Sequence, residues 1–231
     1  MTRVAGVDGC RTGWIVVVAE SGTRLSPEKC VVLGNFGNVL DVTRGCACVA
    51  VDIPIGLTEG SSRDADKEAR QRLGQPRASS VFPAPPRPLL GEFSYAQACA
   101  MSARISGKKI SRQTYGLLRK IREVDEAMKP ALQTRIVETH PELGFWALEG
   151  GRALVDSKRT DRGKRERRRL LMRVYTASFA RLSPPPGSRS DDLHDACVAA
   201  WTASRYVQGQ AGRVPQNPPK DARGLRMEIV F

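Results

Sequence analysis

The sequence has few of the residues that build zinc sites and disulfide frameworks. It contains six cysteines and two histidines among 231 residues, and no two cysteines form a CxxC pair. Structural zinc is bound mainly by cysteine and histidine, and disulfide-stabilised domains concentrate cysteines in short chains. The composition therefore argues against both classes, and we expect reduced thiols in a cytoplasmic protein.

Long hydrophobic runs are also missing. No apolar stretch approaches the roughly 18–20 residues that span a bilayer. The N-terminus leads directly into a strand-like run, without the succession of segments that is typical of a signal peptide. Aromatic residues make up only 6% of the chain, which is too few for a platform that stacks the bases of a single strand. We therefore expect no membrane association.

Positive charge is what the chain has in excess. It has 37 Lys and Arg against 24 Asp and Glu, for a formal net charge of +13. Such an excess attracts polyanions through phosphate neutralisation and counterion release. A proteome generally rich in arginine is the alternative explanation. The net charge favours a nucleic-acid partner. It does not indicate whether the protein forms oligomers.

Apolar, β-branched runs predict a sheet. Residues 4–8 and 14–19 are strand-like and are joined by a tight connection, which predicts an antiparallel hairpin. A third strand is predicted around 30–33. The run 48–51 is apolar throughout, as expected of a central parallel strand buried on both faces. Residues 135–139 repeat the strand pattern after a long helical region.

Helical patterns fill most of the remaining chain. We predict helices at 36–43, 62–73, 93–105, 111–128, 142–148, 157–173 and 190–206. The length suits a single domain over residues 1–231, and the change of character over residues 61–130 indicates a helical insertion within it. We interpret the proline-rich segment 213–223 as a loose wrap.

Acidic residues stand at places that can converge. Asp8 and Asp52 each close a predicted strand, and Asp192 and Asp195 lie three apart where the last helix begins. Neighbouring parallel strands would bring Asp8 and Asp52 to one edge of the sheet, and residues at i and i+3 share a helix face. Hard oxygen ligands of this kind suit Mg²⁺ or Mn²⁺. Each aspartate taken alone also fits a turn or a capping role.

Several segments resemble known families. The segment Asp192-Leu193-His194-Asp195-Ala196 resembles the Asp-x-x-Asp-Ala helix of RuvC-type Holliday junction resolvases. More closely, the whole chain resembles an uncharacterised family of predicted nucleases with a ribonuclease H-like fold, domain of unknown function 429. The motifs that carry this resemblance lie at 6–14, 52–57, 63–70, 79–85, 138–142 and 191–196.

The resemblance implies an α/β fold and a reaction. The fold is a ribonuclease H-like mixed five-stranded sheet flanked by helices. Asp8 would be the bridging metal ligand and Asp52 the second, Asp192 and Asp195 would complete the set, and Glu138 would join the catalytic residues. The implied function is phosphodiester hydrolysis of DNA or structured RNA by two Mg²⁺ or Mn²⁺ ions. A non-catalytic nucleic-acid-binding or nucleotide-binding module of the same superfamily is the alternative.

Basic side chains near the predicted site are candidates for phosphate contacts. Some follow the two strand-end aspartates and others lie on the basic helix 157–173, where a merely solvated face is the alternative. The candidates are Arg11, Arg63, Arg70, Lys158, Arg165, Arg168 and Arg169. His194 lies between the two helix aspartates but is turned away from both, which predicts a packing role.

Overall fold

A mixed sheet forms the centre of the molecule, in a computed structural model that describes residues 2–60, 62–91 and 93–231. The strands are β1 (Thr2–Cys10), β2 (Gly13–Ser21), β3 (Ser26–Leu33), β4 (Cys48–Val51) and β5 (Ile136–Glu138). They form a five-stranded sheet in the order β3-β2-β1-β4-β5. The first three strands are antiparallel, and β4 and β5 run parallel to β1. The predicted hairpin, third strand and parallel strands are confirmed.

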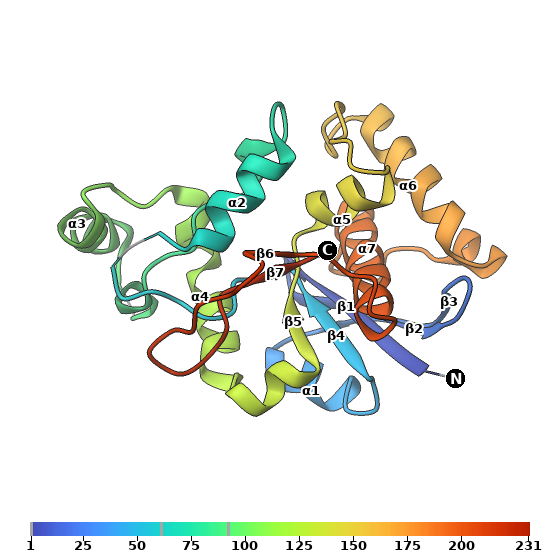
Figure 1. The fold of residues 1–231 in the computed structure, drawn as a ribbon, viewed down its shortest axis with the longest axis horizontal. Coiled ribbons are helices and arrows are strands. Elements are labelled where there is room, and N and C mark those ends of the chain that lie inside the picture. Colours follow the sequence, from blue (N-terminus) through green and yellow to red (C-terminus); the bar gives the residue numbers. More distant parts are fainter. Residues whose placement is uncertain (1, 61, 92) are drawn as a thin grey trace.

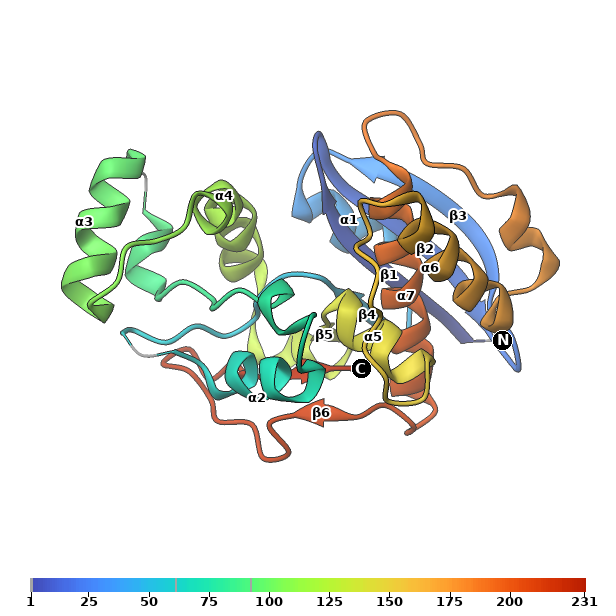
Figure 2. The ribbon, with the colours of Figure 1, turned by 90° about the horizontal axis from the view of Figure 1, so that it is seen from above.

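Helices cover both faces of this sheet (Figures 1 and 2). The helices of the described residues are α1 (Phe36–Val42), α2 (Asp64–Leu73), α3 (Tyr95–Ser106), α4 (Arg112–Ala127), α5 (Pro141–Leu148), α6 (Asp161–Val174) and α7 (Ser190–Val207), and 3-10 turns lie at Ala78–Ser80, Arg87–Leu90, Pro130–Thr134 and Ala177–Arg181. Of these, α2 and α3 lie to one side of the sheet (Figures 1 and 2). Apolar residues of α1 and α4 pack on one face, and those of α5, α6 and α7 pack on the other. The predicted fold class, an α/β fold with a mixed five-stranded sheet flanked by helices, is confirmed.

The strand pattern explains the two cores. Successive side chains of a strand point to opposite faces, so Val7 joins the core under α1 and α4 while Val4 joins the core under α7. All of β4 is buried, as its continuous apolar run predicts. In the chain, α2, α3 and α4 lie between β4 and β5. That residues 61–130 are a helical insertion within a single domain stays a prediction.

Helix α7 lies directly on β1 at Gly6. A Cβ atom on Gly6 would be 2.0 Å from the carbonyl oxygen of Ala196 and 2.1 Å from the nitrogen of Ala200. Real Cβ contacts are never this short, so only glycine lets the helix backbone come so close. The close approach brings the N-terminal part of α7, with Asp195, to the end of β1, where Asp8 lies.

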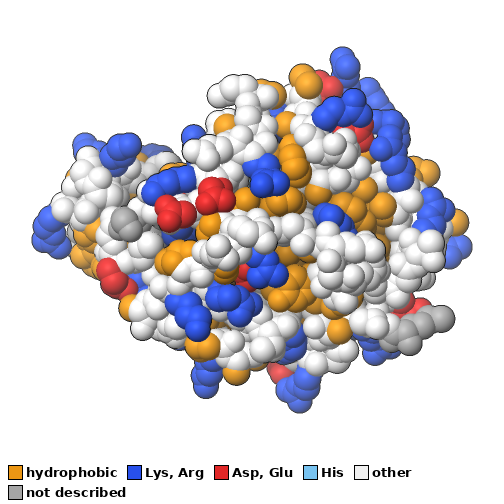
Figure 3. Space-filling view, viewed as in Figure 1, with side chains coloured by type: hydrophobic (Ala, Val, Ile, Leu, Met, Phe, Trp, Pro, Cys, Tyr) orange, Lys and Arg blue, Asp and Glu red, His pale blue; other side chains and the backbone are white. Residues whose placement is uncertain are grey.

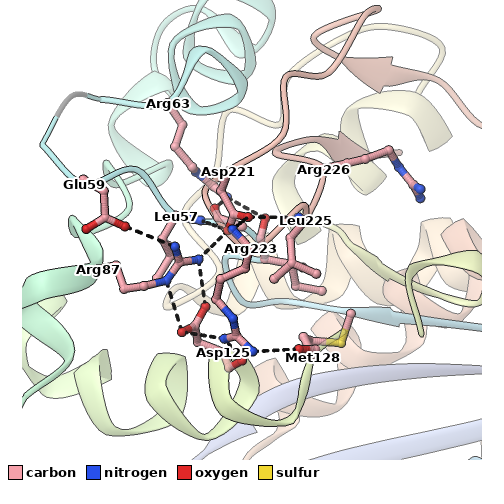
Figure 4. A network of polar contacts seen from close by, with 12 residues as sticks. Leu57, Glu59, Arg63, Arg87, Asp125, Met128, Asp221, Arg223, Leu225 and Arg226 are labelled. Atoms are coloured by element: carbon pink, nitrogen blue, oxygen red, sulfur yellow. Dashed lines mark hydrogen bonds and ion pairs between the residues drawn. The ribbon is translucent and has the colours of Figure 1, made fainter. Parts of the chain in front are cut away.

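The interpretation of residues 213–223 as a loose wrap is wrong. The Asp221 side chain is 0% exposed and contacts Arg87. It also accepts backbone hydrogen bonds from Leu57, Arg223 and Leu225 at 3.0, 2.8 and 2.9 Å. Figure 4 shows this network, which fastens the C-terminal segment to the chain that follows β4 and to the helical region. A short two-stranded sheet, β6 (Arg213–Val214) with β7 (Ile229–Val230), completes the segment.

In the part of the chain that the structure describes, no helix has both the length and the apolar character needed to cross a membrane.

Candidate carboxylate site

A cavity of about 320 Å³ opens where β1, β4 and β5 end. Because these strands are parallel, their carboxyl ends meet at the same edge of the sheet. Asp8 and Asp52 line the cavity, together with loop residues that follow α2 and residues 157–159 that precede α6. Asp8 and Asp52 therefore lie at the same edge of the sheet, as expected for residues at the ends of neighbouring parallel strands.

Asp8 and Asp52 lie close enough for each carboxyl group to influence the pKa of the other. Burial, and after it the charges of Asp52 and Asp195, raise the pKa of Asp8 well above its usual range. Burial also raises the pKa of Asp52. Two carboxylates this close repel each other unless a proton or a cation lies between them.

Asp195 belongs to the same cluster. It is 1% exposed, and its carboxylate contacts the Lys158 ammonium. Burial raises its pKa to about 6, and the charges of Asp52 and Glu142 add to the effect, against the opposing influence of Lys158. Asp195, Asp8 and Asp52, in that order of influence, raise the pKa of Lys158. A single ammonium therefore faces all three of these aspartates.

Asp192 lies at the margin of the cluster. It is half-buried, and its carboxylate accepts a hydrogen bond of 2.8 Å from the backbone nitrogen of Arg189, as in a helix cap. Burial raises its pKa, and its charge is the weakest of the three aspartate charges that raise the pKa of Asp8. Asp192 therefore caps the start of α7 and is also close enough to Asp8 to influence its pKa.

The side chains at the site have the chemistry that a divalent cation requires. Their arrangement is not that of a complete set of metal ligands. Buried carboxylates that influence one another and outnumber the nearby ammonium supply the hard, anionic oxygens that Mg²⁺ and Mn²⁺ prefer. In the described part of the chain, however, no group of three or more His, Cys, Asp and Glu side chains is arranged to hold a metal ion. The carboxylates are arranged around Lys158 instead.

Glu138 and Arg63 form a structural brace rather than a free functional pair. Glu138 accepts hydrogen bonds of 2.7 Å from both terminal nitrogens of Arg63, and another of 2.6 Å from the Ile55 nitrogen. Arg63 is 2% exposed and also pairs with Asp66 at 2.5 Å. We therefore revise the predicted catalytic role of Glu138 and the predicted nucleic-acid contact of Arg63, because both side chains are occupied in holding the loop after Asp52.

The other basic candidates are dispersed. Arg70 donates a 2.6 Å hydrogen bond to the carbonyl of Val81 and so holds the loop over the cavity. Arg168 is partly exposed, lies over the Phe179 ring and bonds the carbonyl of Ala180. Arg165 and Arg169 are exposed on α6, and Figure 3 shows Lys and Arg side chains gathered along the edge that α6 forms. Arg11 is exposed in the turn after β1 and stands apart from α6.

The two histidines have separate structural roles. His194 is 5% exposed and packs inside the helix layer, and burial lowers its pKa to about 4. His140 caps α5 by accepting a 3.2 Å hydrogen bond from the Glu142 nitrogen. It also lines the cavity, together with Asp52.

The chain is similar to a known protein family and to a solved structure. A family model described as "Protein of unknown function (DUF429)" matches residues 6–220. Among solved structures, the chain is similar to one titled "Thermus thermophilus RuvC structure", with 14% sequence identity and a TM-score of 0.42, over 90% of this chain and 98% of that one. No curated protein matches the chain.

Proposed function

This chain belongs to the DUF429 family, and we propose that it is a metal-dependent nuclease acting on DNA or structured RNA. The observation that carries the proposal is the position of Asp8 and Asp52 together on the wall of one cavity at the sheet edge, with Asp195 close enough for its charge to raise the pKa of Asp8. Such proximity is electrostatically unfavourable unless positive charge is supplied. A divalent cation that brings a phosphodiester with it supplies that charge.

Asp8, Asp52 and Asp195 are the residues that would hold Mg²⁺ or Mn²⁺, with Asp192 completing the set. When bound, the metal would lower the pKa of a water and polarise the scissile phosphate. Asp8 and Asp52 would act as ligands in their ionised form, because a protonated carboxyl group is a poor ligand. Lys158 must then leave Asp195, and its side chain, 40% exposed, has room to move toward a phosphate oxygen.

The cavity wall supplies further cations for a polyanionic substrate. Arg159 is exposed and lines the cavity next to Lys158. Arg77 lines it from the opposite loop, and its guanidinium donates a 2.7 Å hydrogen bond to the carbonyl of Val155. These side chains would orient a phosphate over the aspartates. Arg11 and the α6 residues Arg165, Arg168 and Arg169 would contact the backbone further away.

A nucleotide-binding module is the second candidate. The cavity of about 320 Å³ lies at the lower end of the range for small-molecule sites, roughly 300–1,000 Å³. It is narrow for a duplex, and the loop held by Arg70 covers part of it. A single nucleotide, either free or at the end of a strand, is consistent with this size.

The test is cleavage of branched, hybrid and single-stranded substrates by wild type and by Asp8→Asn, with Mg²⁺, with Mn²⁺ and with a chelator. We expect wild-type activity that requires the metal and falls by orders of magnitude in Asp8→Asn. Cleavage unchanged by Asp8→Asn would contradict the proposal and indicate a contaminating nuclease. Saturable binding of mononucleotides without cleavage of any substrate would favour the second candidate.

A further inference from the structure

Glu142 reaches the cavity from the first turn of α5. His140 caps this helix and Pro141 is its first residue, with its ring already suited to the helical backbone. The turn starts directly after β5, so it lies at the same sheet edge as Asp52. Glu142 is 7% exposed and lines the cavity with Asp8, Asp52 and Lys158.

One oxygen of Glu142 is fixed and the other is free. Oε1 accepts a hydrogen bond of 2.6 Å from Arg167, which is 0% exposed. Arg167 is fixed in turn by bonds to the carbonyls of Asp156 and Gly163, at 3.1 and 3.3 Å. Oε2 of Glu142 and Nε of Arg167 are both buried, and neither has a hydrogen-bond partner among the described residues.

An unpartnered carboxylate oxygen in this position requires an explanation. A buried carboxylate oxygen that makes no hydrogen bond is costly, because it has lost its hydration without a replacement. Glu142 is also close enough to the cluster for its charge to raise the pKa values of Asp52 and Asp195. Glu138 differs, since both of its oxygens have partners.

We propose that Glu142 is a further ligand of the cation site, with Oε2 toward the ion and Oε1 held by Arg167. This inference rests on the proposed function, because it adds a carboxylate to the same site. Arg167 is then a positioning residue: it has no access to the cavity contents and acts only through the glutamate. The glutamate of the site would be the one on α5 rather than the one that ends β5.

The test is a titration of Mn²⁺ alone, followed by electron paramagnetic resonance, into wild type, Glu142→Gln, Asp8→Asn and Glu149→Gln. Glutamine keeps an oxygen for Arg167 but places an amide nitrogen, which does not bind cations, at the Oε2 position. Glu149→Gln is the matched control, since Glu149 caps the other end of α5 and pairs with Arg173 at 2.9 Å outside the cavity. We expect Mn²⁺ affinity to fall about 10-fold or more in Glu142→Gln and Asp8→Asn, and to stay unchanged in Glu149→Gln.

The outcomes separate the two proposals. Loss of Mn²⁺ binding in Asp8→Asn with wild-type affinity in Glu142→Gln would overturn the role of Glu142 and leave the nuclease proposal standing. Equal Mn²⁺ binding by wild type and Asp8→Asn would overturn both. A measurement on wild type covers the case in which Glu142→Gln does not fold. Fe²⁺ bound at the site, with ascorbate and peroxide, should cut the chain near residues 8, 52 and 142, and cuts near 8 and 52 without one near 142 would refute the inference.

Discussion

Replacement of Asp221 by asparagine should destabilise the protein although the residue does not line the candidate carboxylate site. Oδ1 of Asp221 accepts hydrogen bonds from the backbone nitrogens of Arg223 and Leu225. Oδ2 accepts from the Leu57 nitrogen at 3.0 Å and contacts Arg87. The carboxylate thus ties the C-terminal segment to the loop that follows Asp52 (Figure 4).

The size of the effect follows from these contacts. The asparagine oxygen can replace Oδ1, but its amide group would face two donors, the Leu57 N–H and the Arg87 guanidinium. A lost hydrogen bond costs about 1 kcal/mol, and a buried donor left without a partner costs about 1–3 kcal/mol. Arg87 is 17% exposed and keeps Asp125 as a partner. We therefore expect a loss of about 3 kcal/mol, at the lower end of the roughly 3–5 kcal/mol for breaking a buried ion pair.

Urea unfolding at pH 7 measures this loss, with Asp41→Asn as the control. Asp41 pairs with Arg44 on the surface, where its side chain is 67% exposed, so its replacement should change the free energy of unfolding by less than about 0.5 kcal/mol. Asp221→Asn within the same limit would refute the reasoning.

The pH dependence gives a second check on Asp221. Burial raises its pKa, but the hydrogen bonds from Arg87 and from the backbone nitrogens outweigh that effect, so the pKa is lowered. A carboxyl group with a lower pKa in the folded state stabilises the fold at pH values above its unfolded pKa of about 3.9. That stability is lost as the pH falls through the folded pKa. The difference between wild type and Asp221→Asn should therefore shrink at acid pH, and a constant difference would contradict the assignment.

Three further predictions concern the brace, the helix contact and the basic face. Glu138→Gln should lower the free energy of unfolding by about 3 kcal/mol in urea, because it leaves Arg63 buried with one carboxylate partner fewer; an effect below about 1 kcal/mol would contradict the brace. Gly6→Ala should abolish the cooperative thermal transition or lower its midpoint strongly, since its Cβ meets the α7 backbone, whereas Gly116→Ala, with nothing within 4 Å, should be neutral or stabilising. Arg165→Glu with Arg169→Glu should weaken binding to a DNA or RNA duplex and reduce its salt dependence, measured by fluorescence anisotropy. The pair Lys108→Glu and Lys109→Glu, exposed in the turn between α3 and α4, should have little effect, and equal losses in both pairs would show that only net charge matters.

The sheet and its strand-end aspartates were predictable because they depend on local patterns. Apolar runs of β-branched residues predict strands, and a carboxylate at the end of each of two parallel strands must reach the same edge. The last helix was equally clear, since its apolar stripe continues for several turns. The order of these elements then predicted that Asp8 and Asp52 lie together.

The partners of buried charges were not predictable from local patterns. Arg63 and Glu138 are separated by 75 positions, and Arg167 and Glu142 by 25. A charged residue in a helix is usually solvated, so the sequence favoured surface roles for Arg63 and for the arginines of α6. The one available signal was context: Glu138 ends a strand that is otherwise apolar, and Arg167 shares a helix face with Leu170 and Leu171.

The two networks around the loop after Asp52 explain how mutually repelling carboxylates remain together. Arg63 donates to the carbonyls of Ile55 and Gly56 while Glu138 accepts from the Ile55 nitrogen. Asp221 holds Leu57 on the other side. The loop is therefore fixed at successive residues, and these contacts oppose a movement of Asp52 away from Asp8. The Lys158 ammonium relieves part of the repulsion between the aspartates, and under the proposed function a divalent cation would relieve the rest.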